Sequence, residues 1–113
     1  MNIAIIGHGF VGKAVDYGFP NNMCNKYIID PKLNTPIEYL KNKNIDFTFV
    51  CVPTPMKEDG TCDTSIVQEV VEWLTTPLIL IKSTIPPGTT DELKAKTGKR
   101  ICFSPEYMGE GKY

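Results

Sequence analysis

The apolar run at the N-terminus and the glycine-spaced turn that follows it constrain the fold of this chain more than any other feature. Ile3 to Ile6 reads as a short buried strand, and it leads directly into Gly7-His8-Gly9-Phe10-Val11-Gly12. In such a G-x-G-x-x-G pattern the first glycine permits a tight turn, the second lets a pyrophosphate approach the backbone, and the third lets the next helix pack against the strand. These six residues are therefore predicted to bind the phosphates of a dinucleotide.

Five short apolar runs alternate with helix-like or irregular segments, which is typical of an α/β fold. The runs are Ile3 to Ile6, Tyr27 to Ile29, Phe47 to Val52, Leu78 to Ile81 and Ile101 to Phe103. We expect one domain over residues 1–113, built as a Rossmann-like open parallel sheet with helices on both faces. The expected strand order is 3-2-1-4-5, with the first and fourth strands flanking the point where a ligand binds.

The helices of this prediction differ in how clearly the sequence marks them. Apolar residues recur at helical spacing from Ile66 to Leu74, with Asp63, Thr64 or Ser65 as the cap. The crossover before the third strand opens with Thr35-Pro36 and carries few apolar residues, so we expect it to be short.

Asp30 lies 18 residues after Gly12, at the end of the second predicted strand. An acid about 20 residues beyond the glycines accepts a hydrogen bond from a ribose 2′-hydroxyl, and its charge repels a 2′-phosphate, which favours NAD over NADP. The competing interpretation is that Asp30 only forms a turn before Pro31.

The run Lys82-Ser83-Thr84-Ile85-Pro86-Pro87-Gly88-Thr89-Thr90 places two hydroxyl groups, Ser83 and Thr84, at the carboxyl end of the fourth strand. Ligands of open α/β sheets bind at that edge, so the run is a candidate reaction site. The alternative is an ordinary strand, turn and helix in which Thr89 or Thr90 caps the helix, Gly98 ends it, and the hydroxyls serve the backbone.

Two further motifs follow the third and fifth strands. In Cys51-Val52-Pro53-Thr54-Pro55 the prolines hold the loop extended, and Thr54 either faces the cofactor or is merely exposed. In Ser104-Pro105-Glu106, the glutamate either activates water as a general base or starts a helix.

Composition excludes several classes of partner. The chain has 12 basic and 13 acidic residues with no basic stripe or tail, which argues against nucleic acid and anionic membranes as partners. The four cysteines are far apart and there is one histidine, so no metal site is predicted. Met1 leads directly into the first strand without a signal sequence, and we expect a cytoplasmic protein.

Taken together, the motifs GHGFVG, Asp30, CVPTP, KSTIPPGTT and SPEYMGEGK resemble the N-terminal NAD-binding domain of the UDP-glucose/GDP-mannose dehydrogenase family over the whole chain. Enzymes of that family oxidise a sugar C6 alcohol to a carboxylate with two NAD, and the resemblance implies a part in such a reaction. It also implies that Val52, Pro53, Thr54 and Ser83 lie along the cofactor, and that Thr84 and Glu106 border it and act in catalysis.

The chain also departs from that family. Ser104 stands where the family has asparagine, and the glycine-rich segment with the family's nucleophilic cysteine, the central helix and the nucleotide-sugar domain are absent. We therefore expect a chain that is catalytically incomplete alone and meets a nucleotide sugar only if the missing domain is supplied. The alternatives are a non-catalytic NAD-binding module that associates with itself or with a full-length dehydrogenase, and the N-terminal domain of a β-hydroxyacid dehydrogenase.

Overall fold

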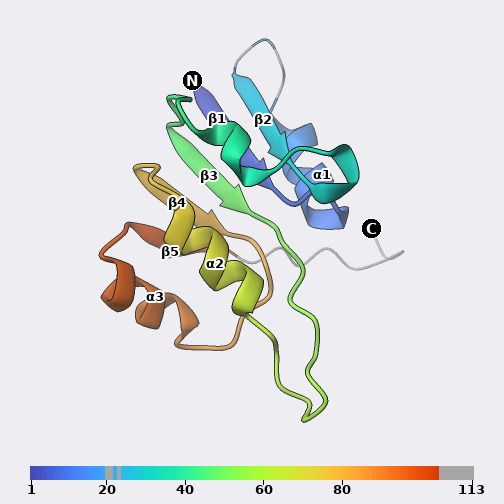
Figure 1. Ribbon diagram of the computed structural model, residues 1–113, viewed down its shortest axis with the longest axis vertical. Coiled ribbons are helices and arrows are strands. Elements are labelled where there is room, and N and C mark those ends of the chain that lie inside the picture. The colour runs from blue at the N-terminus through green and yellow to red at the C-terminus, as the bar shows by residue number, and fades with distance from the viewer. Residues whose placement is uncertain (20–21, 23, 105–113) are drawn as a thin grey trace.

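The computed structural model describes residues 1–19, 22 and 24–104 and shows a five-stranded sheet with helices on both faces (Figure 1). All four strand pairings are parallel. The expected α/β fold with an open parallel sheet is therefore confirmed. In chain order the elements are β1 (Asn2–Ile6), α1 (Phe10–Gly18), β2 (Asn25–Ile29), the 3₁₀ turns η1 (Pro31–Leu33) and η2 (Ile37–Leu40), β3 (Phe47–Val50), α2 (Ser65–Trp73), β4 (Leu78–Ile81), α3 (Thr89–Thr97) and β5 (Ile101–Phe103).

The predicted strand order 3-2-1-4-5 is wrong, because the sheet runs β2-β1-β3-β4-β5. The third strand lies beside β1 on the side away from β2, and Phe47 to Val50 are in register with Ile3 to Ile6. Two hydrogen bonds hold the entry of β3 there: Asp46 N donates to Asn2 O at 2.8 Å, and Asn2 N donates to Asp46 Oδ2 at 2.7 Å.

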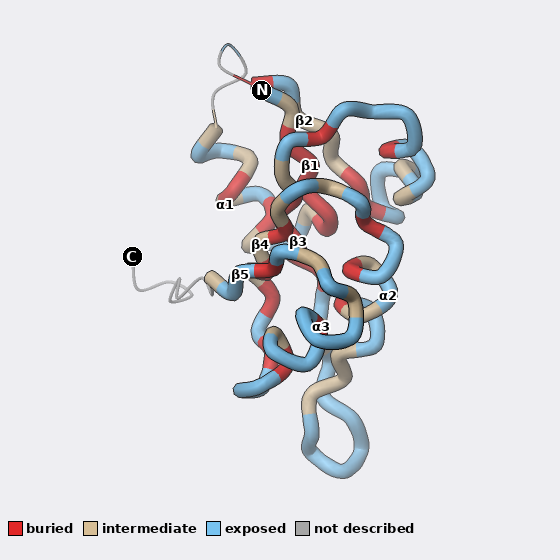
Figure 2. Tube along the Cα trace, turned by 90° about the vertical axis from the view of Figure 1, so that its left-hand side faces the viewer, coloured by how far each residue is buried: buried red, intermediate tan, exposed pale blue. Residues whose placement is uncertain are grey.

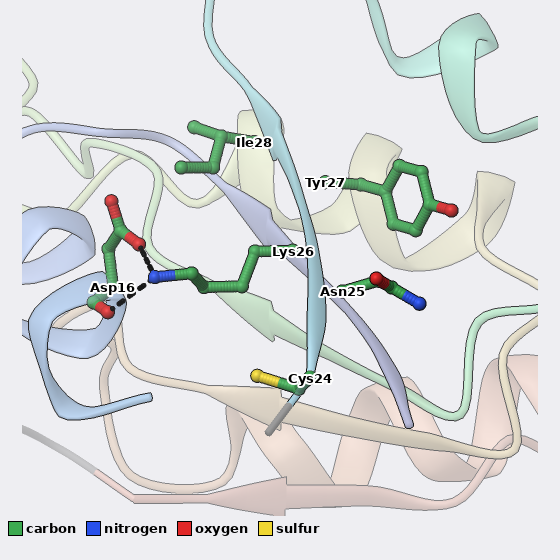
Figure 3. Close-up of a pocket in the computed structure, with 6 residues that line it drawn as sticks. All are labelled: Asp16, Cys24, Asn25, Lys26, Tyr27 and Ile28. Carbon is green, nitrogen blue, oxygen red and sulfur yellow. Dashed lines mark hydrogen bonds and ion pairs between the residues drawn. The ribbon is translucent and has the colours of Figure 1, made fainter. Parts of the chain in front are cut away.

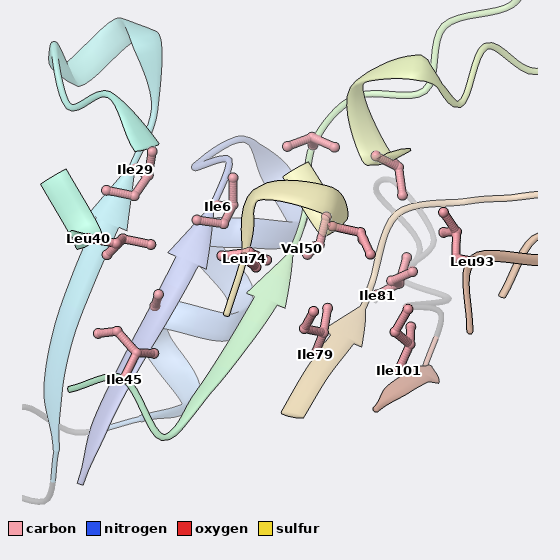
Figure 4. Packing of buried hydrophobic residues seen from close by; sticks show 14 of the residues in the cluster. Ile6, Ile29, Leu40, Ile45, Val50, Leu74, Ile79, Ile81, Leu93 and Ile101 are labelled. Atoms are coloured by element: carbon pink, nitrogen blue, oxygen red, sulfur yellow. The ribbon is translucent and has the colours of Figure 1, made fainter. Parts of the chain in front are cut away.

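Burial explains why β2 takes the edge and β3 the interior. The last three residues of β3, Thr48 to Val50, are buried, which requires neighbours on both sides. By contrast β2 begins with exposed Asn25 and is only partly buried from Lys26 to Ile28. The connection between them crosses β1 as two 3₁₀ turns, and it buries Leu40 and Ile45 in the core that also holds Ile29 and Val50 (Figure 4).

This order moves the point where the strand sequence reverses from the β1/β4 pair to the β1/β3 pair. In sheets of this order the ligand crevice lies outside the carboxyl ends of the two strands at the reversal. The loops that follow β1 and β3 therefore flank the crevice, and the loops after β4 and β5 extend it on one side.

The helices cover the two faces unequally (Figure 2). α1 covers one face, where Val15 packs with Ile3, Ile5 and Phe49. α2 and α3 cover the other face, where the larger core includes Val67, Val71 and Leu93. The sheet is therefore packed on both faces.

The helix boundaries confirm most of the sequence-based expectations. The predicted helix around residues 66–74 is α2, and the predicted short crossover is the pair of 3₁₀ turns. Gly98 ends α3 in a left-handed conformation as predicted, but Gly88 caps its start, so the predicted cap at Thr89 or Thr90 is wrong. A left-handed φ of 89° at the cap position favours glycine over threonine. In the described residues no helix is long and apolar enough to span a membrane.

Candidate functional site

Two glycines of the turn after β1 are required by close packing. Gly7 has φ of 94°, and a Cβ atom placed there would lie 2.5 Å from the carbonyl oxygen of Cys51. A Cβ atom on Gly12 would overlap the carbonyl oxygen of Gly7. The start of α1 is therefore packed directly onto the turn, and the turn onto the end of β3.

Gly9 differs from these two glycines because a Cβ atom there would meet nothing within 4 Å. Gly9 is also the cap residue of α1, and the first bond of that helix runs from Lys13 N to Gly9 O at 2.9 Å. The N–H groups of Phe10, Val11 and Gly12 come before that bond and have no partner within the helix. Open space above Gly9 and N–H groups without a helix partner are the features that a pyrophosphate requires at a helix start.

Asp30 is buried beside this turn and is held by the backbone. Its Oδ2 accepts from His8 N at 2.6 Å and its Oδ1 accepts from Lys32 N at 2.8 Å. These two bonds lower the pKa of Asp30, so the side chain is a carboxylate at neutral pH. Asp30 thus caps η1 before Pro31, as the turn interpretation predicted, and it also lies against the phosphate turn.

Capping occupies only some of the hydrogen-bond acceptor positions of the Asp30 carboxylate. Two carboxylate oxygens offer about four acceptor positions, and the backbone occupies two of them. Asp30 can therefore still accept from a ribose hydroxyl. Its negative charge opposes a phosphate at the same place.

The side chain of His8 points toward α1. Its Nε2 lies 3.0 Å from Asp16 Oδ2. Figure 3 shows the second contact of this carboxylate, in which Asp16 Oδ1 lies 2.6 Å from Lys26 Nζ on β2. Burial raises the pKa of Asp16, but the bonds from Lys26 and His8 outweigh burial and lower it overall. The sequence reasoning missed Asp16 and Lys26; their opposite charges on adjacent elements were the only available signal.

A hollow of about 520 Å³ lies along the same strand, lined by Asp16 and by residues 24–28 (Figure 3). Most of its lining follows the length of β2 at the edge of the sheet and does not come from the loops at the carboxyl ends of β1 and β3. The hollow is therefore separate from the predicted cofactor crevice, and we assign the crevice from the glycine turn and Asp30. These residues, Gly7 to Gly12 and Asp30, are called the phosphate side below.

Across the crevice, residues 52–54 and 82–84 form what we call the hydroxyl side. Ser83 is buried, and its Oγ donates to Val52 O at 2.7 Å and lies 3.3 Å from Val50 O. The hydroxyl of Ser83 thus joins the exits of β3 and β4, so any contribution to cofactor binding would come through Val52. Pro53 is exposed and Thr54 is half-buried.

Thr84 is exposed and lies beside the thiol of Cys62, which the sequence reasoning did not assign to the site. The Sγ of Cys62 lies 3.6 Å from Thr84 O and 3.8 Å from Thr54 O. Cys62 reaches this position because residues 55–63 fold back on themselves, with a β-bridge between Met56 and Cys62. The structure therefore brings Thr54, Thr84 and Cys62 together.

Glu106 lies outside the described residues, so the structure does not place it relative to Thr84. The chain leading to it is described as far as Ser104, whose N donates to Ile81 O at 2.9 Å. Within residues 1–19, 22 and 24–104 no group of three or more histidine, cysteine or acidic side chains is placed to hold a metal ion.

Comparison with known proteins places this geometry in context. The model for the UDP-glucose/GDP-mannose dehydrogenase family, NAD binding domain, matches residues 20–113. A UDP-glucose 6-dehydrogenase from Rickettsia typhi is 32% identical over 153 residues, which cover 98% of this chain and 35% of the relative. One from Streptococcus pneumoniae is 29% identical over 147 residues, covering 99% and 37%.

A solved structure has the same fold. The UDP-glucose dehydrogenase of the hyperthermophilic archaeon Pyrobaculum islandicum superposes with a TM-score of 0.66 at 23% identity, over 97% of this chain and 37% of that one. The chain thus spans about a third of the length of the relatives that it matches. The Rickettsia match runs over 153 residues although this chain has 113, so the relative carries extra residues inside the matched stretch.

Proposed function

This chain belongs to the UDP-glucose/GDP-mannose dehydrogenase family and carries its NAD-binding domain, and from that premise we propose that it serves as the cofactor-binding part of a nucleotide-sugar 6-dehydrogenase. The proposed reaction is of the UDP-glucose 6-dehydrogenase type, in which a sugar C6 alcohol becomes a carboxylate. The observation that carries the proposal is the contact between the turn and the acid: Asp30 accepts from His8 N at 2.6 Å.

The phosphate side fits NAD in three respects. Gly9 leaves open space where the pyrophosphate would lie, and the start of α1 offers N–H groups to it. Asp30 is ionised and would accept from the adenosine ribose, while repelling the additional phosphate of NADP. The remaining proposed cofactor contacts are Val52, Pro53, Thr54 and Ser83, with Thr84 and Glu106 bordering the nicotinamide.

Bound NAD would supply a hydride acceptor to this site. We assign two roles to the chain's own residues. Thr84 would hold a water molecule with its exposed hydroxyl, and Glu106 would take a proton from that water as a general base. This assignment is supported by the position of Thr84 at the carboxyl end of β4, and for Glu106 by the resemblance of the Ser104-Pro105-Glu106 segment to that family.

Catalysis by this domain would require the rest of a family enzyme. In the family the nucleophilic cysteine lies in a glycine-rich segment, which this sequence does not contain. A nucleotide sugar would then be a substrate only together with that segment and a sugar-binding domain. We propose a cytoplasmic location, because the four cysteines do not have the spacing of a disulfide framework.

A non-catalytic NAD-binding module is the second candidate, and the same glycine turn and ionised Asp30 would serve it. Such a module would bind NAD and associate with a full-length dehydrogenase. Co-purification of the two proteins would support this role, whereas sugar oxidation after addition of the missing domain in trans would support the enzyme.

The proposal is tested by titrating NAD into the purified chain by calorimetry, with two aspartate variants. Asp30→Ala should weaken NAD binding by about tenfold or more, since a hydrogen bond to a charged group contributes roughly 1.5–3 kcal/mol. Asp59→Ala is the matched control, because Asp59 also accepts from a backbone N–H but lies in an exposed turn. Equal affinity of the two variants for NAD would contradict the role of Asp30.

A further inference from the structure

Asp16 joins three elements that surround the phosphate side. It lies in the last turn of α1, and its Oδ2 lies 3.0 Å from Nε2 of His8 in the glycine turn. Its Oδ1 lies 2.6 Å from Lys26 Nζ on β2, and its backbone O accepts from the same ammonium group at 3.1 Å (Figure 3). All three residues are partly buried. One carboxylate therefore ties the turn, the helix and the second strand together.

The place of Asp16 in α1 is unfavourable for the helix itself. The C-terminal end of a helix carries partial negative charge, so a carboxylate there is destabilising unless cations offset it. The last turn of α1 contains no basic residue, and the two groups that contact the carboxylate, on Lys26 and His8, come from outside the helix. The acid is therefore explained by its contacts with the turn and with β2, and not by helix formation.

The contact with Asp16 also determines which nitrogen of the His8 ring carries a proton. Burial raises the pKa of Asp16, but the bonds from Lys26 and His8 outweigh it, so the side chain is a carboxylate at neutral pH. A carboxylate only accepts hydrogen bonds. His8 Nε2 must therefore carry a proton and donate it to Asp16, which fixes both the tautomer and the direction of the ring.

His8 carries this constraint to the cofactor side of the turn. Its backbone N donates to Asp30 Oδ2 at 2.6 Å, while its ring is bonded to Asp16. The two bonds hold this residue by its backbone and by its side chain. His8 immediately precedes Gly9, the cap of α1, so holding it also sets how the turn enters the helix.

From these contacts we propose that Asp16 is a positioning residue for cofactor binding on the phosphate side. It acts through His8, which it holds so that Asp30 and the N–H groups at the start of α1 face one ligand. Asp16 lies seven residues after Gly9, which is about 10 Å along the helix, so it would not touch the pyrophosphate itself. This inference rests on the proposed function, because it assumes that NAD binds at the glycine turn.

The test measures the affinity of the full chain and its variants for NAD by calorimetry. Asp16→Ala should weaken NAD by about tenfold, the size expected for loss of a hydrogen bond to a charged group. His8→Ala should give a similar loss, and the double variant should be no weaker than His8→Ala, because the two side chains act through one bond. Asp16→Asn keeps an acceptor for the ring and should weaken NAD by less than about threefold.

Lys26→Met separates positioning from support of the fold. This variant breaks the shorter of the two side-chain contacts of Asp16 and leaves the bond between Asp16 and His8 in place. NAD affinity should change by less than about twofold, although the variant should unfold at a lower temperature. A network that only supported the fold would lose NAD affinity in Lys26→Met as it does in Asp16→Ala.

Nuclear magnetic resonance provides a second readout of the same contact. The sequence contains one histidine, so the imidazole nitrogen signals belong to His8 without further assignment. In the unmodified chain the neutral ring should carry its proton on Nε2, and in Asp16→Ala it should become a mixture of both tautomers. A ring with the same tautomer in both proteins would show that Asp16 does not set it.

Glu72→Ala is the matched control. Glu72 Oε1 also lies 3.0 Å from a basic side chain, that of Lys96, but this pair joins α2 to α3 on the other face of the sheet. NAD affinity should not change. If Asp16→Ala does not fold, as judged by circular dichroism, His8→Ala decides the question alone.

Three results would overturn the inference. Unchanged NAD affinity in Asp16→Ala or His8→Ala would show that the contact positions nothing. Equal weakening by Lys26→Met and Asp16→Ala would show that it only supports the fold. Additive losses in the double variant would show that Asp16 does not act through His8. If the unmodified chain bound no NAD, the proposed function itself would fail, which is a result distinct from these three.

Discussion

On the phosphate side, backbone atoms and one buried carboxylate make the proposed contacts, whereas on the hydroxyl side the proposed reactive groups are side chains on loops. Asp30 and His8 N are bonded at 2.6 Å, and Gly12 is packed onto Gly7. Thr84, by contrast, is exposed. The proposed pyrophosphate and ribose contacts thus come from local chain geometry, whereas the proposed catalytic groups come from separate loops. The substitutions below test this difference between the phosphate side and the hydroxyl side.

The largest effect is expected from Gly12→Ala on the phosphate side. A methyl group there overlaps the Gly7 carbonyl oxygen. Neither the methyl carbon nor that oxygen can move aside, because each is bonded directly to the backbone. We expect the free energy of unfolding to fall by about 3 kcal/mol, the upper range for forced overpacking, and NAD binding to be lost. Urea unfolding followed by circular dichroism measures the first quantity. A variant as stable as the original chain would contradict the packed turn.

Gly9→Ala should separate ligand binding from folding in the same turn. Nothing lies within 4 Å of a Cβ atom at this position, and the backbone there is extended with φ of −82°, which alanine adopts without strain. The free energy of unfolding should change by less than about 1 kcal/mol. NAD affinity should fall by at least about tenfold, because the methyl group would occupy the space of the pyrophosphate. Unchanged affinity in calorimetry would place the pyrophosphate elsewhere.

On the hydroxyl side, Ser83→Ala and Thr84→Ala should differ in stability. Removing the buried Ser83 hydroxyl leaves Val52 O without its donor at 2.7 Å and should cost about 1 to 2 kcal/mol. The Thr84 hydroxyl is exposed, so its removal should change stability by less than about 0.5 kcal/mol. Thermal unfolding of both variants checks this, and a larger loss for Thr84→Ala would reverse the assignment of the two hydroxyls.

The smallest effect concerns pH. The pKa of Asp30 is lowered by the backbone N–H groups of His8 and Lys32, so the folded chain holds the carboxylate form better than the unfolded chain does. Its contribution to stability is present above the unfolded pKa, about 4, and is lost as pH falls through the lower folded pKa. Chemical unfolding between pH 7 and pH 2.5 should show a smaller decline for Asp30→Asn than for the original chain. An equal decline would mean that other carboxylates carry the acid sensitivity.

The sequence predicted the elements of this fold well but not their arrangement. Each of the five apolar runs is a strand, because hydrophobic runs and glycine spacing are local properties that a sequence displays directly. Strand order depends on where a crossover returns to the sheet, and the segment from Asp30 to Asp46 carries no local mark of that. Removing the third strand from the order 3-2-1-4-5-6 and renumbering gives 2-1-3-4-5, the order found here. The extra residues in the Rickettsia relative are consistent with one additional strand and its crossover in that protein.

In the candidate site, too, local features could be predicted from the sequence and long-range contacts could not. The conformational demands on Gly7 and Gly12 could be predicted because they follow from spacing alone. The use of Ser83 as a support for Val52, and the approach of Cys62 to Thr84, could not be predicted. Both depend on loops that are distant in the sequence and meet only in the folded sheet.

The most direct test of the central claim is a parallel titration of the unmodified chain with NAD and NADP. The phosphate side, with its open Gly9 and its ionised Asp30, predicts binding of NAD and an affinity for NADP lower by about tenfold or more. No binding of NAD at millimolar concentration, or equal affinity for the two cofactors, would contradict it.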